Sequence, residues 1–307
     1  MRINTRVVVG VAGTIWTASW LAIWADAGRT LPDAPADPAG WLVGELVTVL
    51  AVGVLVWLSR GRVPRSPLEG VPDRAMWRES FWIVAYVLAV VLGGAALGTR
   101  THIGAAGLDE HSLHAWQAQT RGSIVLWAGY HFVAGAVIPL LVATRWWGYS
   151  PRTLLLRFPD PRRWVPYALV TGAMVLSAFI TPAWLLSPGW AHGLTLLIFS
   201  LGTFLPVMIL LHSLLAPRLA VATGSISVAA AIGGVVYGLY HAREFYLAWD
   251  SLTAVGLSVA WLVQIAFYGA IKTIVTLRTG NAWMHIFVTH MPHLGETPEV
   301  ARVFGRP

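Results

Sequence analysis

The sequence predicts an all-α fold, a polytopic bundle of transmembrane helices, and three observations support this prediction. Charged residues make up only 11% of the 307 residues, whereas hydrophobic residues make up 56%. A soluble domain carries about 25% charged residues, so this chain has too little charge to cover a water-exposed surface. Apolar runs recur at lengths that cross a bilayer. Many of the 17 tryptophans stand at the ends of these runs, where an indole ring favours the headgroup layer.

The apolar runs divide the chain into about eight predicted spans and one shorter segment. A run of about 17 residues or more is long enough to cross the hydrocarbon core. Such runs occupy residues 7–24, 41–58, 81–97, 122–143, 165–186, 193–215, 226–249 and 252–277. The first run is longer than the core of a signal peptide and is predicted to be retained as a span. The last segment, 282–294, is predicted to be a half-span, a re-entrant segment or a buried helix.

Arginines in the loops predict the orientation of the spans. They are concentrated in the loops 59–80 and 144–164, whereas the loops 25–40 and 98–121 are acidic or nearly neutral. Short loops rich in arginine stay in the cytoplasm. The sequence therefore predicts a multi-pass protein of the cell membrane with a cytoplasmic N-terminus. It predicts no nucleic-acid partner, because the net charge of +7 lies in these loops rather than on one binding face.

Ionisable residues inside apolar spans are costly and indicate functional sites. They are Glu45, His131, His212, His241, Arg243, Glu244, Lys272, His285, His290 and His293. Six of the ten are histidines, and five of these six follow residue 211. Glu45 and His131 are predicted to form hydrogen bonds between packed helices, and Lys272 to extend towards the end of its span. The chain has no cysteine, so any metal site must use histidine, carboxylate, amide or water ligands.

Two groups of histidines in the C-terminal half are candidates for a metal site. His241 and Glu244 are three residues apart, so they share a helix face and suit a metal ligand with a second ligand or a base. The alternative is that this segment is the end of a span in the headgroup layer. His285, His290 and His293 follow, but a spacing of five residues places the first two on different faces of a helix. Structural histidines therefore remain an alternative here too.

Three segments of the C-terminal half carry a family resemblance. Residues 237–241 read Y-G-L-Y-H, and residues 278–283 read R-T-G-N-A-W and precede His290. These two segments resemble the F-x-x-x-H motif and the approach to the last histidine motif of the CPBP family, the intramembrane CAAX-protease and bacteriocin-processing group. The stretch 204–219 stands where the paired-glutamate motif of that family, E-E-x-x-x-R, is expected. There, Val207 and Met208 occupy the glutamate positions and His212 the arginine position.

The resemblance implies a domain organisation. Residues 1–144 are N-terminal transmembrane helices without family resemblance, residues 145–295 form a CPBP-like helical core, and residues 296–307 are a polar tail. At the end of the core, Leu294 stands where the family has an asparagine four residues after the histidine.

The resemblance also implies a zinc-dependent intramembrane endopeptidase that acts on a peptide or membrane-protein substrate. The zinc ligands would be His241 and His290, with His285 or His293 as further ligands. Glu244 is the only carboxylate near them in sequence and is the candidate for a replacement general base. His212 is left out of this site, because its depth near the inner end of a span separates it from His241. The alternative function is a non-catalytic membrane adaptor, peptide-binding or immunity-type protein on the same fold.

Overall fold

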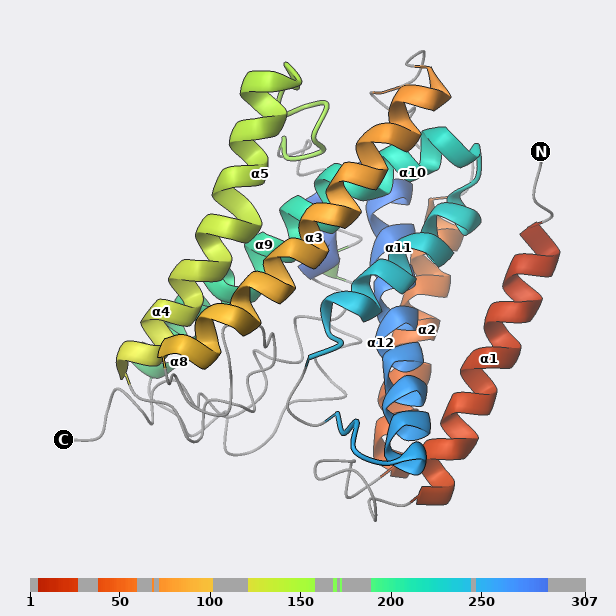
Figure 1. Ribbon diagram of the computed structural model, residues 1–307. Helices are drawn as coiled ribbons and strands as arrows, with labels where there is room; N and C mark the ends of the chain where they lie inside the picture. Colours follow the sequence, from red (N-terminus) through yellow and green to blue (C-terminus); the bar gives the residue numbers. More distant parts are fainter. Residues whose placement is uncertain are drawn as a thin grey trace.

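The structure is a computed structural model, and all of its regular elements are helices in the part of the chain that it describes (Figure 1). The described residues are 5–26, 38–59, 68, 72–101, 121–157, 168–169, 172, 189–243 and 247–286. The prediction of an all-α fold is confirmed. The uninterrupted α-helices are α1 (Thr5–Asp26), α2 (Pro38–Leu58), α3 (Asp73–Thr101), α11 (Ile226–Tyr240) and α12 (Leu252–Thr279).

Two further long helices are divided into α-helical and π-helical segments. The first contains α4 (Arg121–Phe132), η2 (Val133–Val137), α5 (Ile138–Leu141) and η3 (Val142–Trp146), and the second contains α8 (Gly189–Phe199), η4 (Ser200–Phe204), α9 (Leu205–Val207), η5 (Met208–Leu215) and α10 (Ala216–Thr223). Three of the π segments end two residues before Pro139, Pro206 or Pro217. A proline ring clashes with the carbonyl four residues earlier, and a wider turn moves that carbonyl away.

Among the described residues, five helices are long and apolar enough to cross a membrane. They are Arg6–Asp26, Arg74–Leu97, Ile124–Trp146, Leu196–Thr223 and Leu252–Thr279. Two predicted spans correspond to shorter apolar helices, Leu42–Leu58 and Ile226–Tyr240. The predicted span 165–186 lies almost entirely outside the described residues. A multi-pass membrane protein is therefore supported, whereas the count of eight spans is not confirmed.

The predicted span 226–249 is not one helix. Ser225 accepts a hydrogen bond from the Val228 backbone and begins α11, but the helix ends at Tyr240. An α-helix of this length covers about 22 Å, less than the 30 Å of a hydrocarbon core. The chain continues without helix through residues 247–250, where the Ser258 hydroxyl donates to the Ala248 carbonyl (2.8 Å) and accepts from the Ala248 backbone N–H (2.9 Å).

Small residues allow α11 and α12 to pack closely along their length. A side chain on Gly238 would place its Cβ 2.9 Å from the carbonyl oxygen of Leu262, and one on Gly234 would collide with Ala266 and Ala270. In lipid, helices associate through such close backbone approach rather than through the hydrophobic effect. The α11–α12 pair is therefore a fixed centre against which η5 and α3 pack. In Figure 1, α12 lies in the middle of the bundle and α1 at its edge.

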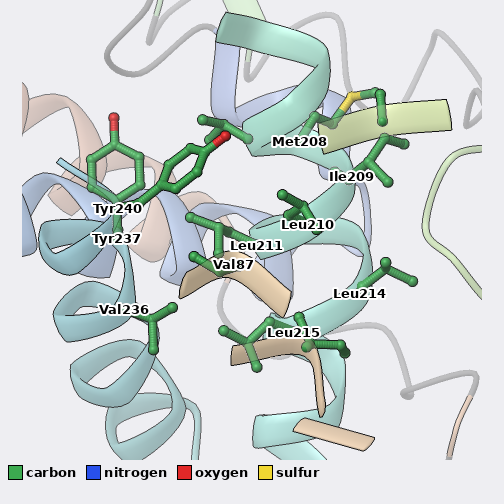
Figure 2. Packing of buried hydrophobic residues seen from close by; sticks show 14 of the residues in the cluster. Val87, Met208, Ile209, Leu210, Leu211, Leu214, Leu215, Val236, Tyr237 and Tyr240 are labelled. Carbon is green, nitrogen blue, oxygen red and sulfur yellow. The ribbon is translucent and has the colours of Figure 1, made fainter. Parts of the chain in front are cut away.

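The largest apolar cluster lies where η5 meets α3 and α11. Figure 2 shows Leu210 and Leu211 of η5 beside Val87 of α3, with Val236 of α11 on the other side. These side chains are nearly all withdrawn from the surface. One face of η5 therefore belongs to a dry core, and the polar residues of the same helix are held at fixed positions beside it.

Candidate functional site

A cluster of polar side chains lies within the bundle, beside the apolar core. It consists of His212 of η5, Tyr237 of α11, Lys272 of α12 and His285 of the 3-10 helix η6 (Ala282–His285). None of these four side chains is more than 6% exposed. Buried ionisable groups in a membrane protein must find partners inside the protein.

The two histidines are in direct contact. The ring centroids of His212 and His285 are 4.8 Å apart, and the ring planes differ by 29°. His285 Nδ1 lies 2.8 Å from the carbonyl oxygen of Ala282. Because a carbonyl only accepts, Nδ1 carries the proton, and Nε2 of a neutral His285 presents a lone pair. Both ring nitrogens of His212 are buried without a hydrogen-bond partner among the described residues.

Lys272 joins the histidine pair to α11. Its Nζ donates a hydrogen bond of 2.6 Å to the Tyr237 hydroxyl and lies 4.3 Å from the centroid of the Tyr237 ring. It is also close enough to His212 and His285 to interact electrostatically with both. The prediction that Lys272 extends towards the end of its span is therefore wrong. The lysine is only 1% exposed because it points into the bundle, where the Tyr237 hydroxyl accepts its hydrogen bond.

The turn after α12 brings His285 to this place. Gly280 has a φ of 64° and ends α12 in the left-handed conformation that glycine adopts without strain. The Asn281 side chain then accepts a hydrogen bond of 3.0 Å from the Trp283 backbone and begins η6. Trp283 Nε1 also donates to the Leu156 carbonyl at 3.0 Å, which fixes η6 against the loop that follows η3. His285 is thereby directed back towards η5.

His241 lies at the broken end of α11. It is the residue after the last helical position, and its ring centroid is 4.7 Å from that of Tyr237. His241 therefore contacts the polar cluster at the Tyr237 ring. Non-helical backbone at membrane depth is tolerated only where protein buries it or where it lines a water-filled space.

The predicted zinc site is only partly within the described residues. Glu244, His290 and His293 lie outside them. Among the residues that are described, no group of three or more His, Cys, Asp or Glu side chains lies close enough together to hold a metal ion. A catalytic zinc site uses three protein ligands, and His212 with His285 supplies two. The ligand set His241, His285, His290 and His293 therefore stays a prediction.

The two positions at which the CPBP resemblance would place glutamates are apolar in three dimensions as well as in sequence. Val207 and Met208 are at most 1% exposed and belong to the cluster drawn in Figure 2. A carboxylate at either position would be buried among leucines, at a cost of several kcal/mol unless it were paired. Both positions therefore belong to the hydrophobic core.

A second polar cluster lies near one end of α3 and α10. Arg218 Nε donates to Glu79 Oε2 at 2.7 Å, and Arg218 Nη1 donates to the Leu214 carbonyl at 2.7 Å. The Tyr149 hydroxyl donates to the same carboxylate at 2.8 Å. The guanidinium carbon also lies 4.6 Å from the Tyr149 ring centroid and 5.1 Å from that of Trp147. This ion pair joins α3, α10 and the loop after η3.

A third polar cluster joins α1, α2 and α12. Trp20 Nε1 donates to Glu45 Oε2 at 2.6 Å, so the predicted hydrogen bond between Glu45 and a neighbouring helix is present. The Gln264 amide donates to the Trp16 carbonyl (3.2 Å) and to the Ser19 hydroxyl. The Tyr268 side chain lies beside the Glu45 carboxyl group. Glu45 is fully buried, and its Oε1 has no hydrogen-bond partner within the described part of the chain.

Comparison with other proteins adds no identification. No family model matches this chain, and neither a curated protein nor a solved structure matches it. The resemblance to the CPBP family therefore rests on the three sequence segments alone. The function has to be argued from the clusters described above.

Proposed function

We propose that this chain is a non-catalytic integral membrane protein on a CPBP-like helical core, and that it acts by binding a peptide or another membrane protein. The observation that carries this proposal is the packing of Val207 and Met208. These residues stand where the family places its paired glutamates, and both are buried in an apolar cluster. Hydrolysis of a peptide bond needs an activated water, and a valine or methionine cannot accept its proton.

The surroundings of the histidine pair support the same conclusion. Lys272 lies close enough to both histidines to interact electrostatically with them, and a protonated amine there would repel a metal cation. The described cluster contributes imidazole, amine and phenol groups, and each of these can form hydrogen bonds with polar groups of a partner. This set of groups suits a polar contact that joins helices or receives a partner.

The test uses the full-length protein purified in detergent without chelators, together with assays in cells. We expect zinc well below one equivalent per chain by elemental analysis. We also expect a His241→Ala/Glu244→Gln variant to complement a deletion strain as well as the wild type does. Stoichiometric zinc that is lost in a His241→Ala/His290→Ala variant, together with failed complementation, would overturn the proposal.

The second candidate is the zinc-dependent intramembrane endopeptidase. The contact between His212 and His285 favours it, because two imidazoles are held together and Nε2 of His285 presents a lone pair. Ligating histidines commonly donate their other N–H to a backbone carbonyl, as His285 does. This candidate predicts that His212→Ala lowers zinc content as strongly as His285→Ala, whereas His131→Ala leaves zinc content unchanged.

A further inference from the structure

Exposed arginines gather at one end of the bundle. This end is formed by the start of α3, the end of η3 and the loop of residues 147–157 (Figure 1). Five exposed arginines lie on these segments: Arg74, Arg78, Arg145, Arg152 and Arg157. None of the five forms an ion pair within the described part of the chain. Their positive charges are therefore not neutralised by the side chains described around them.

Short-range contacts hold these segments together. The Tyr149 hydroxyl donates to the Glu79 carboxylate at 2.8 Å and joins the loop to the start of α3. The Leu155 carbonyl accepts a hydrogen bond of 3.0 Å from the Ala282 backbone and joins the loop to η6. Gly148 has a φ of 71°, which allows the chain to turn back after η3. Arginines from two helices and one loop are thereby kept at the same end of the bundle.

The acidic side chain described at this end is already paired. Glu79 accepts a hydrogen bond of 2.7 Å from the buried Arg218. Among the other acidic side chains that the structure describes, Glu45 is buried in α2. Asp26 ends α1 and Asp250 precedes α12, at the opposite end of the bundle (Figure 1). The excess positive charge of the described side chains is therefore concentrated at the end that carries the arginines.

Exposed tryptophans indicate that these arginines lie at the depth of the lipid headgroups. Trp77 is 46% exposed and lies between Arg74 and Arg78 in α3, and Trp146 is 81% exposed and follows Arg145. Indole rings favour the headgroup layer of a bilayer. The phosphate groups of lipids occupy the same layer, and a guanidinium group can donate two parallel hydrogen bonds to a phosphate.

We propose that this end of the bundle binds the headgroups of anionic phospholipids. The sequence predicts that the arginine-rich loops face the cytoplasm, and the anionic lipids of the cytoplasmic leaflet attract basic segments beside membrane spans. A zwitterionic headgroup also carries a phosphate, but its own amine cancels the charge that the arginines recognise. This interaction uses the surface of the bundle and is independent of peptide binding and of the His212 cluster.

The test uses the full-length protein reconstituted in phosphatidylcholine bilayers with a trace of spin-labelled lipid. Electron paramagnetic resonance measures the fraction of the label that is held at the protein surface. We expect this fraction to be larger for phosphatidylglycerol than for phosphatidylcholine. Each arginine near the surface strengthens binding to anionic lipid about fivefold, so Arg78→Gln/Arg145→Gln should lose most of the preference. Arg78→Lys/Arg145→Lys should keep it, because both positive charges remain.

Two controls separate this surface from other causes of a lipid preference. Arg121→Gln/Arg243→Gln removes the same charge from exposed arginines at the start of α4 and after α11, and should keep the wild-type preference. Inorganic phosphate should weaken the preference no more than chloride does at equal ionic strength, because the ligand is a lipid rather than free phosphate. Equal association of both lipids with the wild type would overturn the proposal. Equal effects of the two glutamine pairs, or a preference that inorganic phosphate alone removes, would overturn it as well.

Discussion

The Arg218 cluster and the His212 cluster are both buried, but they differ in how completely their hydrogen bonds are satisfied. Arg218 is bonded to Glu79 and to the Leu214 carbonyl, and only its Nη2 lacks a hydrogen-bond partner among the described residues. In the His212 cluster, both ring nitrogens of His212 lack such a partner within the described residues, although His285 and Lys272 lie beside them. The Arg218 cluster pairs opposite charges, whereas the His212 cluster brings together groups that are neutral or positive.

The difference indicates different roles. A buried ion pair with fixed geometry holds elements together, since removal of one partner leaves the other charge buried and unpaired. A buried polar group that makes no hydrogen bond lowers the free energy of unfolding. Its presence therefore indicates a role other than stability. The Arg218 cluster is therefore a structural joint between α3, α10 and the loop after η3, and the His212 cluster is the candidate for function. Substitutions in the two clusters can break or sharpen this comparison.

The largest effect is expected for Arg218→Ala. The substitution removes the charge that pairs with Glu79 and both ring contacts, so the free energy of unfolding should fall by about 3–5 kcal/mol. Thermal unfolding of the detergent-purified protein measures the loss. Arg218→Ala/Glu79→Gln should recover part of it, because no unpaired carboxylate remains. If the double variant is no more stable than Arg218→Ala, the ion pair is not the joint that we describe.

A smaller effect that depends on pH is expected for Tyr149→Phe. Burial and the hydrogen bond to Glu79 raise the pKa of Tyr149 above its ordinary value of 10.0, so the folded protein favours the neutral hydroxyl. At neutral pH the lost hydrogen bond should cost about 1.5 kcal/mol, the lower end for a charged acceptor. The contribution of Tyr149 is fully present below pH 10 and is lost as the pH rises through the raised pKa.

The wild type should therefore lose its stability advantage over Tyr149→Phe when both are heated at increasing pH from 8 to 11. A constant difference between wild type and Tyr149→Phe over this range would show that the hydroxyl does not ionise in the folded protein or does not support Glu79.

The smallest effect on stability is expected for His212→Leu. Leucine fills a similar volume, and the substitution removes two buried nitrogens that have no hydrogen bonds within the described residues. Replacement of such a group by an apolar one is nearly neutral or stabilising, so the melting temperature should stay the same or rise. A large loss of stability would show that His212 is a structural residue like Arg218.

The local features of the chain were predictable from sequence. Apolar length located the helices α1, α3 and α12, and the search for ionisable groups within spans identified Glu45, His212, Lys272 and His285. The hydrogen bond from Glu45 to a neighbouring helix was expected because a lone carboxyl group in a span needs a partner. These predictions succeed because they depend on residues close together in the chain.

Other features were not predictable in this way. Depth within the spans predicted that His212 lies apart from His241 and outside the histidine site. However, η6 folds back after Gly280 and places His285 against His212. Lys272 was expected to extend towards the end of its span, because the tyrosine that accepts its hydrogen bond is on another helix. The end of α11 at Tyr240 was also missed, since apolar residues continue beyond it to Trp249. Gly280 and Asn281 were the only sequence signals for the turn that decides the site.

By itself, the sequence determined that this protein is a bundle of apolar helices with a few ionisable residues inside it. The count of charges and the length of apolar runs are sufficient for that conclusion, because lipid accepts only a backbone whose polar groups are bonded within the helix. Only the tertiary structure decided which ionisable residues meet. Glu45 lies far in sequence from Tyr237, Lys272, His212 and His285, and the contacts of these residues depend on close packing of small residues and on two places where a helix ends.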